Sequence, residues 1–128
     1  MASKEFARIR LRLVELKRAK RHPFPEPGTR LEAPNEQGVY VIYSPKGEVL
    51  HVGRTYRGTA GLRQRLSNHL HAASSFTIKY LKGRGAKLRN GYSFSFVLVP
   101  EPRNRALLEA FATGSLCPRH LGMSDKSK

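Results

Sequence analysis

Two apolar segments on either side of a short turn constrain the fold of this chain most. Residues 39–43 are β-branched or aromatic, residues 44–47 (Ser-Pro-Lys-Gly) have the composition of a turn, and residues 48–52 lead back. This order predicts an antiparallel hairpin. A third strand is expected over residues 92–99, where serines alternate with aromatics before an apolar run that is typical of a central strand.

Helical patterns follow the hairpin and the third strand. Leu62, Leu66 and Leu70 mark one face of a helix, and Gly114 is in position to end the last one. The expected helices cover about residues 61–73, 75–81 and 103–113. The order strand, strand, helix, helix, strand, helix predicts an α+β domain with a small mixed or antiparallel three-stranded sheet flanked by helices.

The N-terminal part has a different composition. Apolar residues recur at helical spacing over residues 3–20, with Ser3 as N-cap, which predicts a basic amphipathic helix. A strand is the alternative over residues 9–13, where apolar residues alternate with arginines. Prolines 23, 25 and 27 argue against both a helix and a central strand. We therefore expect a basic helix (1–22), a Pro-rich linker (23–35), a compact domain (36–122) and a disordered tail (123–128).

The charge of the chain indicates its partner. It has 24 Lys+Arg against 9 Asp+Glu, a formal net charge of +15. Such a surface attracts phosphate backbones, so nucleic acid is expected first, with a ribosome-associated protein or a binder of anionic membranes as alternatives. We expect no membrane span, secretory signal or disulfide, because apolar runs are short and Cys117 is alone. A cytoplasmic, nucleoid-associated protein is predicted.

Tyr40 and His51 fall on the two strands of the predicted hairpin, which can place them side by side on one face. A phenol and an imidazole can each hold a water molecule, or take a proton from it, near a phosphate. The alternative for Tyr40 is packing on the sheet, and for His51 a hydrogen-bonded, partly buried position.

Arg65 and His69 are four residues apart on a predicted helix and therefore share a face. The planar guanidinium of Arg65 suits phosphate oxygens, and His69 can hydrogen-bond a phosphate or donate a proton to it. A solvated helix face that merely attracts DNA is the alternative. Further basic residues are expected to contact nucleic acid: Arg54, Arg57, Arg63, Lys79, Lys82 and Arg84.

Glu109 is one of few acids in the second half of the chain, where only Glu101 and Asp125 accompany it after Glu48. One carboxylate can hold Mg²⁺ together with waters and phosphate oxygens. The alternative is an exposed ion pair with Arg105, a pair of this kind contributing roughly 0.3–0.5 kcal/mol.

In order along the chain, these residues resemble the GIY-YIG nuclease family over about residues 36–121. Residues 38–40 (Gly-Val-Tyr) stand at the first signature triplet and residues 51–53 (His-Val-Gly) at the second, joined by a hairpin. Residues 62–70 are similar to the helix that carries an arginine and, four residues on, a histidine or tyrosine. Residues 107–109 match the helix with the metal-binding glutamate, and residues 116–120 resemble the Pro-basic-aromatic stretch after it.

The chain departs from the family pattern twice. His51 replaces the tyrosine that opens the second triplet, and Leu121 stands where the family usually has asparagine. The first change alters a residue near the attacking water, and the second removes a polar group at the edge of the site.

The resemblance implies a metal-dependent endonuclease that hydrolyses phosphodiester bonds in DNA with one divalent ion, Mg²⁺ or Mn²⁺. Tyr40 would orient or deprotonate water with help from His51, Arg65 would stabilise the phosphate, His69 would position it or relay a proton, and Glu109 would bind the metal. The expected substrate is double-stranded or branched DNA, with single strands also open. No membrane or small-molecule cofactor is expected, and the chain would be a monomer or homodimer. The alternative is a non-catalytic nucleic-acid-binding domain on the same fold.

Overall fold

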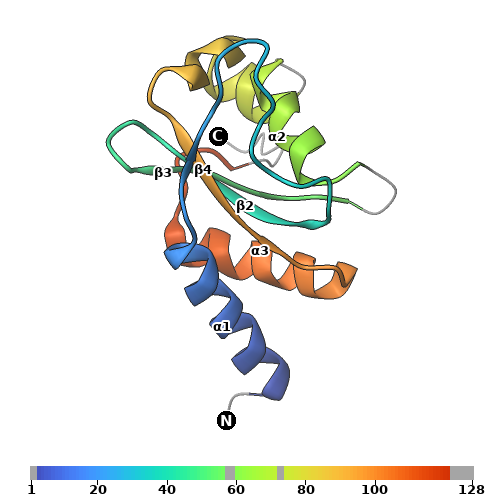
Figure 1. Ribbon diagram of the computed structural model, residues 1–128. Helices are drawn as coiled ribbons and strands as arrows, with labels where there is room; N and C mark the ends of the chain where they lie inside the picture. Colours follow the sequence, from blue (N-terminus) through green and yellow to red (C-terminus); the bar gives the residue numbers. More distant parts are fainter. Residues whose placement is uncertain (1–2, 57–59, 72–73, 122–128) are drawn as a thin grey trace.

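A four-stranded antiparallel sheet lies between two helical layers in the computed structural model (Figure 1), which describes residues 3–56, 60–71 and 74–121. The strands in spatial order are β1 (His22–Pro23), β4 (Ser93–Leu98), β2 (Gly38–Tyr43) and β3 (Val49–Arg54). The predicted α+β class and antiparallel hairpin are confirmed, but the sheet has four strands rather than three. β3 is an edge strand, so side chains from both helical layers can reach around it.

Helices cover both faces of the sheet (Figure 1). On one face lie α1 (Lys4–Arg18) and α3 (Pro102–Leu116), which pack on each other and on the strands. On the other lie α2 (Leu62–Leu70), the π-helical turn η1 (Phe76–Tyr80) and the 3₁₀ turn η2 (Gly85–Arg89). Two apolar clusters result, one on each face of the sheet.

The fourth strand comes from the proline-rich segment, for which no strand was expected. β1 pairs with β4, with His22 opposite Phe94. Proline has no backbone N–H to donate. It is tolerated in β1 because β1 is an edge strand, whose outer side forms no hydrogen bonds within the sheet. In the segment that follows β1, the side chains of Phe24, Leu31 and Ala33 are buried in the core. This segment therefore builds part of the core.

The helix predicted near the N-terminus is confirmed over α1, and the strand alternative is wrong. The Ser3 side chain accepts a hydrogen bond from the Phe6 backbone N–H at 3.0 Å, which caps the helix. Ile9, Leu13 and Leu16 are buried against the sheet and α3. α1 therefore completes the core on its face of the sheet.

An irregularity in the hairpin decides which way His51 points. His51 is opposite Ile42, but Val49 is opposite Tyr43, so Leu50 is an extra residue in β3. Val49 and Val52 consequently pack on the α1 and α3 side, whereas Leu50 packs on the α2 side. The bulge turns His51 to the α2 side as well, the side on which Tyr40 packs.

The C-terminal segment returns to the sheet after α3. The prediction that Gly114 ends the helix is wrong, because α3 continues to Leu116 and ends at Cys117 in the left-handed conformation (φ 48°). The backbone N–H groups of Arg119 and His120 then donate to Val49 and Leu50 on the free edge of β3, at 3.2 and 2.8 Å. The expected tail, residues 123–128, lies outside the described residues. Within the described ranges, no helix is long and apolar enough to cross a bilayer.

Candidate active site

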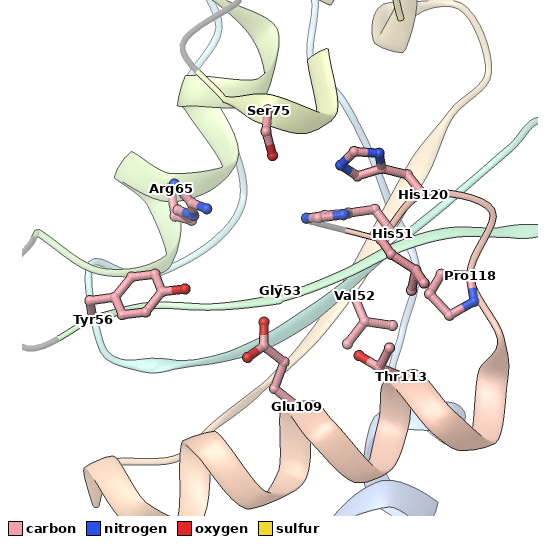
Figure 2. Close-up of a pocket in the computed structure, with 11 residues that line it drawn as sticks. His51, Val52, Gly53, Tyr56, Arg65, Ser75, Glu109, Thr113, Pro118 and His120 are labelled. Carbon is pink, nitrogen blue, oxygen red and sulfur yellow. The ribbon is translucent and has the colours of Figure 1, made fainter. Parts of the chain in front are cut away.

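A polar pocket of about 280 Å³ lies beside β3, between α2 and α3 (Figure 2). β3 forms its floor, α3 its lower wall, and α2 with the start of η1 its upper wall. The C-terminal segment closes the remaining side. The lining residues are His51, Val52, Gly53, Tyr56, Arg65, Ser75, Glu109, Thr113, Pro118, His120 and Leu121.

Glu109 projects from α3 into this pocket, and its side chain is 25% exposed. Its Oε1 atom is 3.4 Å from Nη1 of Arg54. Burial raises the pKa of the Glu109 carboxyl, while Arg54 and Arg65 oppose that rise. The alternative pair with Arg105 does not form, because the buried guanidinium of Arg105 donates to the carbonyls of Val99 and Pro100. Glu109 is thus a pocket residue.

Arg65 reaches the same pocket from α2, on the opposite side of β3 (Figure 2). Its Nε atom is buried and, within the part of the chain that the structure describes, has no hydrogen-bond partner. The Arg65 side chain also hydrogen-bonds the Tyr40 hydroxyl. Because a buried guanidinium N–H is costly to leave unpaired, a guanidinium at this position favours an anion in the pocket.

Tyr56 is a pocket residue that the sequence analysis missed. Its hydroxyl points toward the pocket centre (Figure 2), and Arg54 and Arg65 lie 5.0 and 5.8 Å from its ring centroid. Cations at such distances are attracted to the ring face, so Tyr56 fixes both arginines near the pocket mouth.

Tyr40 does not line the pocket. It is opposite Gly53 on β3, and a Cβ at Gly53 would collide with the Tyr40 hydroxyl. The glycine therefore lets the tyrosine ring lie across the neighbouring strand, directly behind the pocket floor. Burial raises the pKa of Tyr40, and nearby Arg65 opposes that effect. Tyr40 and His51 share a face, as predicted, but are diagonal neighbours with ring centroids 6.0 Å apart.

A buried chain of hydrogen bonds holds Tyr40 in place. Its hydroxyl is 2.7 Å from Nε2 of His69, and Nδ1 of His69 is 2.6 Å from Oγ of Ser74. Ser74 in turn donates to Thr77, and Thr77 donates to the carbonyl of His69. Because the hydroxyl proton of Ser74 is donated to Thr77, Ser74 can only accept from His69. Nδ1 of His69 therefore carries the proton and donates to Ser74, and Nε2 accepts from the Tyr40 hydroxyl.

His69 therefore lies behind the pocket in the core and does not line it. Burial lowers its pKa well below the usual value, with His51 and Arg65 adding to the effect. A neutral His69 matches the tautomer that the hydrogen bonds require.

His51 lines the pocket and stacks on Phe76, with centroids 4.9 Å apart. By strict distance and angle, neither of its ring nitrogens has a hydrogen-bond partner within the described residues. Burial lowers its pKa to about 3, helped by His120 and Arg65, while a looser hydrogen bond with the His120 backbone opposes the shift. The ring is therefore neutral at physiological pH.

His120 is a second pocket residue that was not singled out. The pairing of the C-terminal segment with β3 places its ring 5.3 Å from that of His51. Leu121, at the position where the resemblance leads one to expect asparagine, also lines the pocket. His120 is thus the polar group of this segment in the pocket.

The basic residues predicted to contact nucleic acid do not form one surface. Arg54 is at the pocket, whereas Arg63 donates from Nε to the carbonyl of Ala33 at 2.9 Å and lines a different hollow. Exposed basic residues occur on η1 and just after it, namely Lys79, Lys82 and Arg84. Arg57 lies outside the described residues.

The pocket fits a hydrated divalent cation. Among the described residues, no three His, Cys, Asp or Glu side chains converge to form a protein cage. Mg²⁺ does not need one, because it keeps several waters and binds through one or two carboxylates plus phosphate oxygens. Glu109 is such a carboxylate, in a polar space large enough for water.

Comparison with solved structures identifies the fold. The chain is similar to the GIY-YIG N-terminal endonuclease domain of UvrC from Thermotoga maritima bound to magnesium, with 19% identity, a TM-score of 0.50, and coverage of 93% of this chain and 97% of that domain. Two point mutants of the same domain, bound to the catalytic divalent cation, match with 18–19% identity and the same TM-score. The chain therefore has the GIY-YIG fold. No family model matches its sequence, and no curated protein does either.

Proposed function

We propose that this chain is a metal-dependent endonuclease that hydrolyses phosphodiester bonds in DNA. The observation that carries this proposal is the convergence of Arg65 and Glu109 on one pocket from opposite helical layers. A guanidinium suits a phosphate, and a lone carboxylate suits a hydrated cation. The GIY-YIG fold, which the chain shares with an endonuclease domain, supports the same assignment.

Arg65 would hold the scissile phosphate. Its unpaired buried Nε–H would gain a phosphate oxygen as acceptor. A fixed cation of this kind would stabilise the extra negative charge of the transition state.

His51 would orient the attacking water. A neutral imidazole keeps one nitrogen lone pair, with which His51 can accept a hydrogen bond from that water. The low pKa makes it a weak base in the free protein, but the negative charge of a bound phosphate would raise that pKa. His51 would then become a better proton acceptor with the substrate in place.

Tyr40 would act from behind the pocket floor. Because its hydroxyl donates to His69, its oxygen lone pairs face away from that bond, and the Arg65 side chain hydrogen-bonds the hydroxyl there. Loss of the Tyr40 proton along the bond to His69 would be needed before Tyr40 could serve as a base. Its raised pKa opposes this in the free protein, and Arg65 favours it.

Glu109 would bind the metal, exchanging its contact with Arg54 for the cation. A divalent ion there would supply Lewis-acid stabilisation of the phosphate and the leaving oxygen. The exposed basic groups on and after η1, together with Arg54, would attract the DNA backbone.

The proposal is tested by Glu109→Gln, which keeps the shape of the side chain and removes its charge. Cleavage of supercoiled, linear, branched and single-stranded DNA is measured with and without Mg²⁺. We expect the rate to fall at least about 100-fold, because a metal contributes several kcal/mol of charge stabilisation. DNA binding should persist.

Glu5→Gln is the matched control, because Glu5 is also paired with an arginine, Arg103 at 2.7 Å, but lies on α1 away from the pocket. It should cut at the parent rate. If Glu109→Gln does so too, the metal assignment is wrong. If the parent chain binds DNA and cuts none of the four substrates with Mg²⁺ or Mn²⁺, the chain is a non-catalytic binding domain on this fold.

A further inference from the structure

The rings of His51 and His120 form a wall of the pocket that is separate from the Glu109 carboxylate (Figure 2). Their centroids are 5.3 Å apart, and their planes are inclined at 38°. Both residues are more than nine-tenths buried, with exposed fractions of 6% and 9%. A ring nitrogen of each is directed toward the open part of the pocket, below Ser75 (Figure 2).

By strict distance and angle, three of the four nitrogen atoms in this pair have no hydrogen-bond partner among the described residues, although a looser hydrogen bond between the His51 ring and the His120 backbone acts on the pKa of His51. They are Nδ1 and Nε2 of His51 and Nε2 of His120. The neighbouring His69 is different, because Tyr40 and Ser74 satisfy both of its nitrogens. Buried polar atoms in native proteins are nearly always paired. Unpaired imidazole nitrogens in a pocket wall therefore indicate a ligand.

We propose that His51 and His120 together form a second metal site, for a divalent transition-metal ion that prefers nitrogen ligands, with Zn²⁺ as the ion to test. Zinc bonds imidazole nitrogen at roughly 2.0–2.1 Å, so two imidazoles on a tetrahedral zinc have centroids about 5 Å apart. The observed spacing of 5.3 Å matches this geometry. Water takes the remaining positions, since no third His, Cys, Asp or Glu converges there within the described ranges.

Ligand chemistry separates this site from Glu109. Mg²⁺ prefers oxygen ligands and retains its waters, whereas imidazole suits zinc, nickel and copper. The two rings are also in the ligating form, because burial lowers the pKa of both, and the neutral imidazole is the form that binds metals.

Zinc bound to the histidine pair would occupy space that the DNA phosphate and its water need. We therefore expect Zn²⁺ to inhibit Mg²⁺-dependent cleavage. This consequence rests on the proposed function, but zinc binding itself does not.

Isothermal titration of the untagged full-length chain with ZnCl₂ at pH 7 tests the site directly. His120→Ala removes one ligand, and His51→Phe removes the other while keeping a ring against Phe76. We expect each variant to bind zinc at least about tenfold more weakly, because loss of even an outer-shell partner of a metal ligand costs 10- to 100-fold in affinity. Urea unfolding of each variant without metal establishes that it is folded.

Two exposed residues give matched controls. His71→Ala removes an imidazole, and Cys117→Ser removes a thiol, from positions outside the pocket lining. Both should retain the parent zinc affinity, as should Glu109→Gln.

The site is overturned if the parent chain binds no zinc, which would leave water on these nitrogens. It is also overturned if both pocket-histidine variants keep the parent affinity, or if a control variant loses it. The two proposals fail separately. A chain that binds zinc through His51 and His120 but cuts no DNA retains this site, and a chain that cuts DNA but binds no zinc retains only the proposed function.

Discussion

Tyr40→Phe is expected to lower both the stability and the activity of this protein, for separate reasons. The substitution keeps the ring that fills the core behind Gly53 and removes one fully buried hydroxyl. That hydroxyl donates to Nε2 of His69 over 2.7 Å. Without it, Nε2 remains buried with no donor, and an unsatisfied buried acceptor costs about 1–3 kcal/mol.

Urea unfolding measures this loss. For a small protein the free energy of unfolding falls by about 2 kcal/mol per molar urea, so a loss of about 1–3 kcal/mol should lower the midpoint by roughly 0.5–1.5 M. The cleavage rate at saturating DNA should fall at least about 100-fold, in the range that general acid–base catalysis contributes.

Tyr43→Phe separates the two effects. Tyr43 is as deeply buried, and its hydroxyl bonds Ser95 at 3.0 Å, but it packs on the α1 and α3 side of the sheet. It should lose a comparable amount of stability and keep its cleavage rate. An unchanged midpoint for Tyr40→Phe would refute the hydrogen-bond chain, and equal rates for both variants would refute a role of Tyr40 in cleavage.

Two further predictions concern the same buried region. Gly53→Ala should destabilise the fold by about 1–3 kcal/mol, as overpacking does, because the new Cβ collides with the Tyr40 hydroxyl. Gly114→Ala, in the last turn of α3 where a Cβ meets nothing within 4 Å, should stabilise the fold by roughly 0.5–1 kcal/mol. Equal effects of the two substitutions on urea unfolding would contradict both predictions. The free energy of unfolding, measured in EDTA to remove metal ions, should fall as pH drops below about 6.5. The pKa of His51 is about 3 in the folded chain and near 6.5 in the unfolded chain, so protonation favours the unfolded chain. His51→Phe should reduce the slope of the free energy of unfolding against pH by up to about 1.4 kcal/mol per pH unit. An unaltered slope would show that the pKa of His51 is the same in the folded and unfolded chains.

The spacing of apolar residues in the sequence was enough to predict the positions of the residues that lie on strands and helices. Tyr40 lies on an apolar strand, Arg65 on a helix with leucines at regular spacing, and Glu109 on an apolar helix. In each case the spacing of the neighbouring apolar side chains indicates whether the segment is a strand or a helix, and hence on which side of it the residue lies. The antiparallel hairpin then sets β2 beside β3 without any long-range information.

Contacts between distant segments account for what was missed. His120 is in the pocket only because the chain after Cys117 pairs with the edge of β3, a contact that no local pattern encodes. β1 forms because the edge of β4 was open to it, although prolines usually interrupt strands. The diagonal position of His51 depends on the bulge at Leu50, which apolar alternation does not reveal.

The contact between Arg54 and Glu109 explains how a pocket in so basic a chain can keep a carboxylate ready for a cation. At 3.4 Å, and with both side chains partly exposed, the pair contributes at most about 1 kcal/mol. Such a pair opposes the rise that burial causes in the pKa of Glu109, and it is weak enough to be exchanged. In the proposed function, Arg54 would turn to a phosphate of the DNA and leave the carboxylate to a hydrated metal. The same phosphate would accept a hydrogen bond from the Nε–H of Arg65, so one bound phosphate would offset the positive charge of both arginines and supply the acceptor that this N–H lacks.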